Sequence, residues 1–535
     1  MSYLLSHYLA ESVARDPGRT AVATKRGTLT YAQLDAESDR VARALADAGI
    51  GRGARVGLCM PKQLRAVAAM HGVLKAGAAY VPVDPAAPPL RGGFILGDCA
   101  VRALVTTRRK LHDYREVLSG LAALELVILV DDERGELPAG APRALAWSEL
   151  PDSGPLTSTP PAIESDPAYL LYTSGSTGNP KGVILSHRHA RTFVDWGRDT
   201  FGVHADDRLS NHAPLHFDLS VFDIYVAISA GACVSIVPDD ITAFPMELAK
   251  WIDADGITVW YSVPSALVRL LLHGQLERFR YDRLRTILYA GEVFPIKHLR
   301  EVMARLPRVA FFNLYGPTET NVCTWYALPS PLPAEVAEIP IGAACANTDV
   351  FAVDDAGGEV TDVGGTGELL VRGPALLLGY WGLPERTRAS LIVNPLQPAY
   401  QEPAYRTGDI VRLGADGLWY FVGRRDHMVK SRGYRIELGD IEQALHQHER
   451  VKEAVVIAVP DEEVGNRLHA AVAPVDGASL APHELQAFCL ERLPRYMVPE
   501  SFILRGDLPK TSTGKIDRVA LRQEIQSTHQ ETVLP

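Results

Sequence analysis

A run of glycine, hydroxyl and lysine residues between positions 172 and 182 has the chemistry of a phosphate-binding loop. Backbone N–H groups freed by glycine can surround phosphate oxygens, hydroxyl groups add donors, and Lys181 adds positive charge. No Gly-Lys-Ser/Thr triplet follows at the spacing of a mononucleotide P-loop, so a different type of loop is expected. The alternative is a flexible surface loop. The segment reads Tyr172-Thr173-Ser174-Gly175-Ser176-Thr177-Gly178-Asn179-Pro180-Lys181-Gly182.

Residues further along the chain have side chains that suit the other parts of a nucleotide. Glu319 is a hard oxygen ligand for Mg²⁺, an ion that needs few protein ligands when it bridges phosphates. Asp409 can accept hydrogen bonds from two ribose hydroxyls, while Tyr315 offers a ring face to a base and Asn313 an amide to its edge. Lys515 can stabilise the charge that develops when a carboxylate attacks a phosphate. Taken alone, Asp409 and Lys515 would each be read as turn residues.

These side chains need a scaffold, and the periodicity of the first part of the chain predicts alternating strands and helices. Thr30 and Gln33 form a capping-box pattern, and apolar residues recur at helical spacing up to Gly49. Strands are expected at 56–59, 80–83, 126–130 and 168–172, and an alanine-rich helix at about 64–76. This alternation is typical of an α/β sheet. The stretch 137–167, rich in Pro, Ser and Gly, is expected to be a surface excursion.

Length and composition limit the classes of protein to consider. A chain of 535 residues is too long to fold around one hydrophobic core of ordinary size, which predicts two to four structural units. A net charge of -10 argues against a large nucleic-acid footprint, and the six cysteines, without metal-ligand spacing, are expected to be reduced and mostly buried thiols. The most apolar stretch, 117–130, is short for a membrane span, and the N-terminus lacks a signal-peptide pattern. A cytoplasmic protein without a membrane partner is expected.

The segment 172–182 resembles the phosphate loop of the adenylate-forming superfamily, which includes acyl-CoA synthetases, luciferases and nonribosomal peptide adenylation domains. Other segments resemble this superfamily in its own order, and together they cover about residues 10 to 520. They are Leu29-Thr30-Tyr31, 74–84, Asn313-Leu314-Tyr315-Gly316-Pro317-Thr318-Glu319, Tyr405-Arg406-Thr407-Gly408-Asp409, Gly423-Arg424-Arg425-Asp426, 430–437, 493–499 and 513–518. The resemblance implies an α/β fold with a large layered N-terminal domain of α/β subdomains, residues 1–425. A small mobile α+β C-terminal domain, residues 426–535, follows a hinge at Asp426.

The resemblance also implies roles for individual residues. ATP and Mg²⁺ are the implied cofactors, Glu319 and Thr177 the implied magnesium ligands, and Lys515, Glu319 and Thr177 the implied catalytic residues. The residues implied to bind ATP or AMP are Thr173, Ser174, Gly175, Ser176, Thr177, Gly178, Lys181, Gly291, Asn313, Tyr315, Gly316, Thr318, Asp409, Arg424 and Lys515.

Two half-reactions follow from the resemblance. A carboxylate and ATP give an acyl-adenylate and pyrophosphate, and a thiol then gives a thioester and AMP. Rotation at Asp426 withdraws Lys515 and brings residues 430–433 to the thiol's channel, where Arg432 and Gly433 are implied to lie. Gly433 suits that place because a residue without Cβ lets another chain pass closely.

The substrate is expected to be an amino acid, because Asp218 lies in a Phe-Asp-x-Ser pattern and a carboxylate there can pair with a substrate ammonium. The other pocket positions are mostly apolar and predict a compact aliphatic side chain. This set resembles the pocket of enzymes that adenylate L-proline, and valine, leucine and pipecolate are the alternatives. Some of these residues could equally be core residues. The pocket residues carried over are Asp218, Leu219, Phe222, Tyr261, Leu288, Ala290, Leu314, Val322, Cys323 and Lys515.

The expected partner is a separate holo peptidyl carrier protein, in pyrrole-type or nonribosomal peptide biosynthesis. Seventeen residues follow Arg518, too few for a carrier domain, so action in trans is expected. Two other classes stay open. An acyl-CoA or aryl-CoA ligase is disfavoured by Asp218, and a catalytically silent adenylate-binding protein is disfavoured by the intact Lys515, Glu319 and Asp409.

Overall fold

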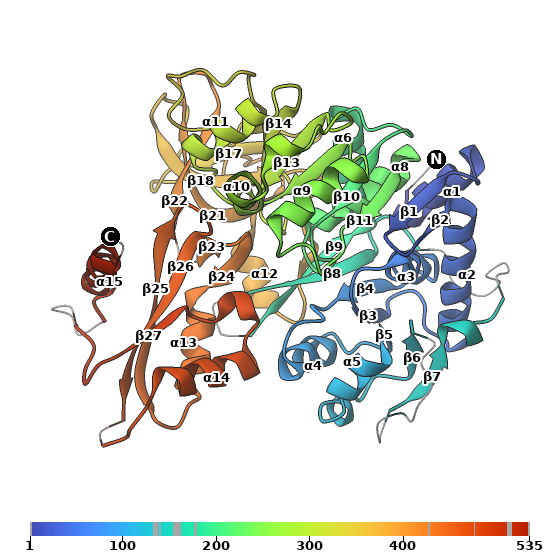
Figure 1. Cartoon of the computed structure of the whole chain (residues 1–535), viewed down its shortest axis with the longest axis horizontal. Coiled ribbons are helices and arrows are strands. Elements are labelled where there is room, and N and C mark those ends of the chain that lie inside the picture. Colours follow the sequence, from blue (N-terminus) through green and yellow to red (C-terminus); the bar gives the residue numbers. More distant parts are fainter. Residues whose placement is uncertain are drawn as a thin grey trace.

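The computed structural model describes residues 3–131, 137, 141–152, 162–175, 179–425, 428–475, 477–510 and 516–532 (Figure 1). Residues up to Arg425 form the large part of the molecule, and the elements from Met428 onward form a smaller part beside it. No helix in the described ranges combines the length and the apolar character that crossing a membrane requires. The domain boundary predicted at Asp426 lies outside the described residues and stays a prediction.

One mixed sheet is built mainly from the first 190 residues. Its parallel strands β3, β4, β5, β6, β7 and β8 have their carboxyl ends at one edge, whereas β9 runs antiparallel to β8. Loops that follow β3, β4 and β8 therefore meet at that edge. Within the described residues the strand order is β19 (Gly379–Tyr380), β9 (Lys181–Ser186), β8 (Pro167–Thr173), β4 (Ala79–Pro82), β3 (Arg55–Cys59), β5 (Ala103–Thr106), β6 (Leu126–Leu129) and β7 (Arg143–Ala146).

A second mixed sheet contains the strands that carry most of the predicted pocket. Its strands β10, β12, β13 and β14 are parallel neighbours, so the segments after them also meet at one edge. The described order is β16 (Ala343–Ala344), β15 (Thr324–Ala327), β14 (Ala310–Tyr315), β13 (Thr286–Ala290), β12 (Val259–Ser262), β10 (Arg208–Asn211), β11 (Cys233–Ile236), β1 (Thr20–Thr24) and β2 (Gly27–Thr30).

Helices fill the space between the two sheets and cover their outer faces. The main core joins apolar residues of both sheets with those of α1 (Leu5–Arg15), α2 (Tyr31–Asp47), α3 (Leu64–Lys75), α6 (His187–Thr200) and α8 (Ala227–Ala230). Outside the second sheet lie α9 (Pro245–Ala254), α10 (Pro264–His273) and α11 (Ile296–Arg305), and outside the first lie α4 (Pro89–Asp98) and α5 (Arg108–Asp113). The result is a layered α/β arrangement, as the sequence predicted (Figure 1).

Local sequence signals explain several of these elements. The α2 helix begins with the predicted capping box, in which Thr30 accepts from the Gln33 backbone N–H and the Gln33 side chain accepts from Thr30, and Gly49 ends it with a φ of 68°. The α3 helix is apolar nearly all round because it lies between the sheets. The stretch predicted as a surface excursion contributes β7 at the edge of the first sheet.

A third, antiparallel sheet leads from the large part to the small one. It contains β17 (Asp349–Val353), β18 (Thr366–Arg372), β21 (Pro403–Leu413), β20 (Leu391–Val393) and β22 (Trp419–Arg424), and α12 (Pro384–Ser390) lies beside it. The pair β21 and β22 places Asp409 directly opposite Arg424. Two predicted site residues from different motifs are thus neighbours by strand register.

The small part is an α+β unit with its own core. The hairpin of β23 (Met428–Ser431) and β24 (Tyr434–Glu437) leads into α13 (Leu438–His446), and the sheet β25 (Val451–Asp461), β26 (Gly465–Pro474) and β27 (Ser501–Leu504) follows. Helices α13 and α14 (Pro482–Arg492) pack on one face of this sheet, and α15 (Arg518–Thr532) packs on the other. Figure 1 shows the hairpin on the side that faces the large part and α15 on the far side.

Candidate active site

The described residues of the predicted phosphate loop lie against the C-terminal hairpin. The loop joins β8 to β9, with Thr173 and Lys181 opposite each other in register. The Ser174 hydroxyl donates to the Arg435 carbonyl at 2.8 Å, and the Gly175 backbone N–H donates to Oδ2 of Asp440 at 3.2 Å. The loop therefore follows a strand but returns as a second strand, unlike a mononucleotide P-loop. The predicted residues Ser176, Thr177 and Gly178 lie outside the described residues.

Glu319 is a fully buried carboxylate surrounded by donors. Its side chain has 0 % exposure and accepts from Arg435 Nη1 at 2.9 Å and from the Tyr380 hydroxyl at 2.7 Å, with Lys181 Nζ 3.5 Å away. Burial alone would raise the pKa of Glu319, but Arg435 and Lys181 outweigh it and hold that pKa well below its usual range. A buried anionic carboxylate beside the phosphate loop fits the predicted magnesium ligand.

Lys181 is also buried, with its ammonium 4.7 Å from the centre of the Tyr380 ring. Burial and the nearby Arg435 lower the pKa of Lys181 to about 7, although Glu319 opposes this shift. The cost of burying this ammonium falls when an anion approaches it. This electrostatic setting fits the predicted role of Lys181 in binding phosphate.

Two of the residues predicted to bind the nucleotide, Arg424 and Tyr315, contact Asp409. Arg424 Nη1 donates to Oδ1 of Asp409 at 2.5 Å, and the Tyr315 hydroxyl donates to Oδ2. Asn313 and Tyr315 both lie on β14, and the Asn313 amide donates to the Pro340 carbonyl at 2.8 Å. Asp409 and Arg424, on the consecutive strands β21 and β22, therefore form one cluster with Tyr315, which is 94 positions from Asp409 in sequence.

Asp218 follows β10 at the edge where the parallel strands of the second sheet end. Its Oδ2 accepts from the Thr318 hydroxyl at 2.6 Å, which joins the predicted ammonium site to a predicted nucleotide-binding residue. Desolvation raises the pKa of this part-buried carboxyl, while Thr318 and Lys430 oppose the shift. A cationic group at Asp218 would offset that desolvation.

The predicted pocket residues lie on neighbouring elements behind Asp218. Register places Tyr261 beside Leu288, and Ala290 beside Leu314. The Phe222 ring, on a short π-helix, lies 5.4 Å from the Tyr261 ring, measured between centroids. One apolar cluster includes Leu219, Phe222, Tyr261, Leu288, Ala290, Leu314 and Val322, whereas Cys323 belongs to the adjacent cluster with its Sγ 3.6 Å from the Tyr315 carbonyl oxygen. Their role in binding substrate stays a prediction.

The predicted thiol-channel residue Gly433 lies at the turn of the C-terminal hairpin. Its φ is 81°, and a Cβ built on it would come within 2.3 Å of Val263 Cγ1. Both the backbone conformation and the close contact therefore require glycine at this position. The Gly433 backbone N–H donates to Oε1 of Glu292 at 2.5 Å, and a Cβ built on Gly291 would lie 3.9 Å from the Gly433 carbonyl oxygen. The sequence did not predict Glu292, although an acid two residues after the buried strand β13 is a usable signal.

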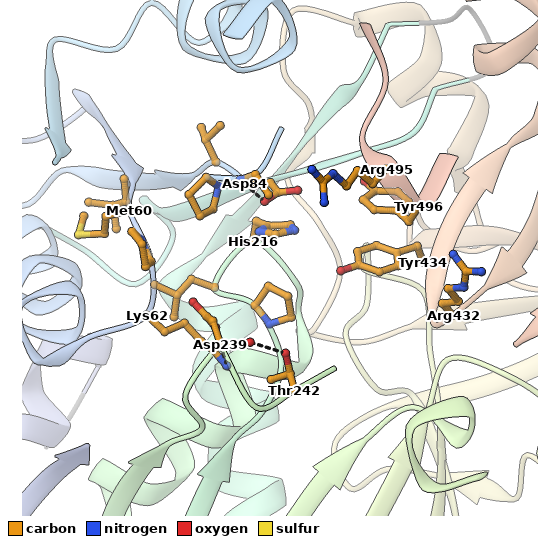
Figure 2. A pocket seen from close by; sticks show the side chains of 17 residues that line it. Met60, Lys62, Asp84, His216, Asp239, Thr242, Arg432, Tyr434, Arg495 and Tyr496 are labelled. Atoms are coloured by element: carbon orange, nitrogen blue, oxygen red, sulfur yellow. Dashed lines mark hydrogen bonds and ion pairs between the residues drawn. The ribbon is translucent and has the colours of Figure 1, made fainter. Parts of the chain in front are cut away.

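A cavity of about 480 Å³ opens between the two parts of the molecule, beside this hairpin (Figure 2). Lys62 and Asp84 reach it from the loops after β3 and β4, and His216 from the loop after β10. Arg432 and Tyr434 reach it from the hairpin, and Arg495 and Tyr496 from the segment after α14. Tyr434 and Tyr496 stack at 3.7 Å, and Tyr434 lies 5.6 Å from Phe217, next to Asp218. The sequence did not predict most of this lining.

Besides Thr177, two predicted residues with large roles are outside the described ranges. They are Lys515, the predicted catalytic ammonium, and Asp426, the predicted hinge. Ile516, next to Lys515, packs with Val455 and Leu521 on the face of the C-terminal sheet that carries α15. The sequence also missed Arg435, Asp440 and Tyr380, whose contacts with the phosphate region are described above.

Comparison with known proteins adds family relationships to this geometry. The profile of the AMP-binding enzyme family matches residues 9–381, and that of the AMP-binding enzyme C-terminal domain matches residues 440–515. An L-proline–[L-prolyl-carrier protein] ligase of Pseudomonas fluorescens is 39% identical over 523 residues, covering 98% of this chain and 99% of that protein. A protein of the same name from Streptomyces coelicolor is 38% identical and covers 91% of each chain. The amide bond synthetase McbA from Marinactinospora thermotolerans superimposes with a TM-score of 0.85 at 25% identity, over 97% of this chain and 99% of that one.

Proposed function

Because the chain belongs to the AMP-binding enzyme family, we propose that it activates L-proline with ATP and transfers the prolyl group to the phosphopantetheine thiol of a carrier protein. The observation that carries this proposal is similarity at 38–39% identity, over nearly the full length, to two proteins named as L-proline–[L-prolyl-carrier protein] ligases. Asp218 and the compact apolar set behind it support an amino acid with a small aliphatic side chain.

In the first half-reaction the proline carboxylate attacks the α-phosphate of ATP, and pyrophosphate leaves. The Asp218 carboxylate holds the proline ammonium, and the apolar side chains around Phe222 and Tyr261 enclose the ring. Gly175 and Lys181 supply a backbone donor and a positive charge for the phosphates, and Asp409 accepts hydrogen bonds from the ribose.

Mg²⁺, when bound, neutralises charge on the ATP phosphates, and Glu319 would hold it together with the predicted ligand Thr177. The role proposed for Lys515 is to offset the negative charge that accumulates when the two anionic reactants approach each other. Both Thr177 and Lys515 enter through the resemblance of their motifs, and substitution of Lys515 by alanine should abolish adenylation while nucleotide binding persists.

In the second half-reaction the carrier thiol attacks the carbonyl carbon of prolyl-AMP, the bond to the phosphate oxygen breaks, and AMP leaves. The cavity of Figure 2 is the proposed route for the phosphopantetheine arm, because it lies between the two parts and reaches Tyr434, next to Gly433 and Phe217. Glycine at position 433 lets the hairpin lie directly against Val263 beside this route, because a Cβ there would come within 2.3 Å of Val263 Cγ1.

The experiment that tests the proposal is ATP–pyrophosphate exchange with a panel of amino acids, followed by mass spectrometry of a holo carrier protein after incubation with ATP, Mg²⁺ and proline. Proline-dependent exchange and a carrier mass increased by one prolyl group are expected. If exchange is faster with valine, leucine or pipecolate than with proline, that amino acid and not proline is the substrate. If the enzyme loads CoA but does not load any carrier protein, the acceptor is CoA and not a carrier protein.

A further inference from the structure

Asp98, the last residue of α4, joins two aromatic side chains at the base of the predicted phosphate loop. Its Oδ2 accepts from the Tyr172 hydroxyl at 2.5 Å, and its backbone carbonyl accepts from the Trp381 indole N–H at 2.8 Å. Tyr172 lies near the end of β8, which leads into the loop. The Trp381 backbone N–H donates to the carbonyl of Gly182, on β9, at 2.8 Å. Asp98 thus links the strand that enters the loop to the strand that leaves it.

The two aromatic side chains pack around Gly182. Strand register places Tyr172 directly opposite Gly182. A Cβ built on Gly182 would lie 3.0 Å from Cε2 and Cζ of Tyr172 and 3.2 Å from Cβ of Trp381, closer than ordinary van der Waals contact. The position of the Tyr172 ring therefore sets how closely β8 and β9 approach each other at the base of the loop.

The residues next to these two aromatic residues lie on the side of the phosphate site. Tyr172 packs with the apolar cluster under α4, and adjacent residues of a strand point to opposite sides. Thr173 accordingly points away from α4, and its buried Oγ1 has no hydrogen-bond partner among the described residues. Tyr380, the residue before Trp381, donates to Oε1 of Glu319 at 2.7 Å. Thr173 and Glu319 are the residues assigned above to ATP and Mg²⁺.

The hydrogen bond between Tyr172 and Asp98 joins a neutral phenol to a solvated carboxylate. Burial, together with Cys99 and Asp98, holds the pKa of the Tyr172 hydroxyl well above its usual range, so the hydroxyl stays a donor. The Sγ of Cys99, which like the other cysteines is free and buried, lies 3.0 Å from the same hydroxyl. Asp98 is exposed, so its carboxylate accepts this bond without losing its contact with water. Hydrogen bonds to ionised acceptors are stronger than those between neutral groups.

The geometry points to Asp98 as a positioning residue for the binding of ATP. It lies on the outer side of the first sheet and acts through Tyr172 and Trp381, which hold the strands that present Thr173 and Tyr380 to the phosphate site. A loop rich in glycine loses much conformational freedom when it orders around a ligand, and fixed ends reduce that loss. This inference rests on the proposed function, since it concerns the ATP site of that reaction.

Exchange kinetics of substituted enzymes test this role. Asp98→Ala and Tyr172→Phe should each raise KM for ATP at least fivefold in proline-dependent exchange, while KM for proline changes less than twofold. The two effects should not add in the double variant, because both substitutions remove the same hydrogen bond. Asp98→Asn keeps an acceptor oxygen and should raise KM for ATP less than threefold. Asp113→Ala is the matched control, because Asp113 pairs with Lys110 on the surface of the neighbouring helix α5.

Calorimetric binding of ATP and of AMP, without any amino acid, separates the phosphate loop from the nucleoside site. AMP keeps the contacts to the nucleoside but lacks the β- and γ-phosphates. For Asp98→Ala we expect the Kd of ATP with Mg²⁺ to rise at least fivefold and that of AMP less than twofold. Trp381→Phe removes only the indole donor and should weaken ATP binding in the same selective way. An unchanged Kd for AMP also shows that the variant is folded around the nucleoside site.

The results distinguish this inference from the proposed function. An equal rise in KM for ATP and for proline would overturn the inference, as would Asp98→Ala behaving like Asp113→Ala. Additive effects of Asp98→Ala and Tyr172→Phe would also overturn it, because the two residues would then act separately. Exchange that depends on another amino acid would instead overturn the proposed substrate. The affinities for ATP and AMP need neither proline nor carrier, so the two failures are separable.

Discussion

The Thr318 hydroxyl donates a 2.6 Å hydrogen bond to Oδ2 of Asp218, across 100 positions of sequence. Asp218 lies after β10 and Thr318 after β14, and both segments leave the same edge of the second sheet. The bond holds the carboxylate in one orientation beside the apolar residues that carry the predicted pocket. Thr318 also adjoins Glu319, so a single turn contacts the proposed ammonium and phosphate sites.

Substitutions at these two residues should affect amino-acid activation to different degrees. Asp218→Asn removes the charge that pairs with the proline ammonium, and a charge-assisted hydrogen bond contributes about 1.5–3 kcal/mol. We expect kcat/KM for proline in the exchange assay to fall at least tenfold. Thr318→Val removes one supporting bond and should cost about three- to tenfold. If Asp218→Asn were as active as the parent enzyme, Asp218 would not bind the proline ammonium.

Gly433→Ala should impair carrier loading more than exchange. The added Cβ would lie 2.3 Å from Val263 Cγ1, and a φ of 81° is unfavourable for alanine. The hairpin must therefore shift away from the docked position. Gly506→Ala, in the same part of the molecule, is the control, since no atom lies within 4 Å of its Cβ position. Loss of loading by both variants to the same extent would contradict the specific role of Gly433.

Gly197→Ala should reduce the preference for proline by moving the Phe222 ring. A Cβ at Gly197 on α6 would come within 3.0 Å of Phe222 Cε2, and the rings of Phe201 and Tyr261 already lie 5.8 and 5.4 Å from that ring. We expect kcat/KM for proline to fall more than that for alanine. Thr192→Ala on the same helix controls for general effects. An unchanged ratio of proline to alanine would show that Phe222 does not border the substrate.

His71→Leu should make the protein less sensitive to acid. His71 is fully buried on α3, and within the described residues neither ring nitrogen has a hydrogen-bond partner. Burial lowers its pKa to about 3, with Lys75 contributing. Below pH 6.5 His71 is protonated in the unfolded chain but stays neutral in the native protein. The free energy of unfolding therefore falls by about 1.4 kcal/mol per pH unit until the pH reaches the native pKa of His71.

Urea midpoints for both proteins, measured between pH 7.5 and 4.5, check this prediction. The midpoint of the parent protein should drop more steeply than that of His71→Leu below pH 6.5. Parallel curves for the two proteins would assign the acid sensitivity to other groups, such as His189, which burial affects in the same direction.

The sequence predicted those parts of the fold that depend on neighbours along the chain. The capping box at Thr30, the end of α2 at Gly49 and the strands around 56–59 and 80–83 all follow from local pattern, and the structure confirms them. Strand β7 was not predicted, because a short strand in a Pro- and Ser-rich stretch lacks a clear alternation of apolar residues. Its pairing with β6 depends on tertiary structure.

The sequence predicted many residues of the site but few of the contacts between them. Motif resemblance named Glu319 and Asp218, but nothing local links Glu319 to Arg435, 116 positions later. Such pairs depend on how the two parts pack, which hydrophobic periodicity does not report. Thr177, Asp426 and Lys515 lie outside the described residues, so their roles stay predictions.

Several contacts between the two parts join polar groups that water can also solvate. Glu319 with Arg435, Gly175 with Asp440, and Gly433 with Glu292 all join polar atoms in this way. Exposing apolar surface raises heat capacity, whereas exposing polar surface lowers it. Separation of the parts should therefore change heat capacity far less than unfolding does. A van't Hoff plot of docking should be close to a straight line, although the stability curve of the same protein bends.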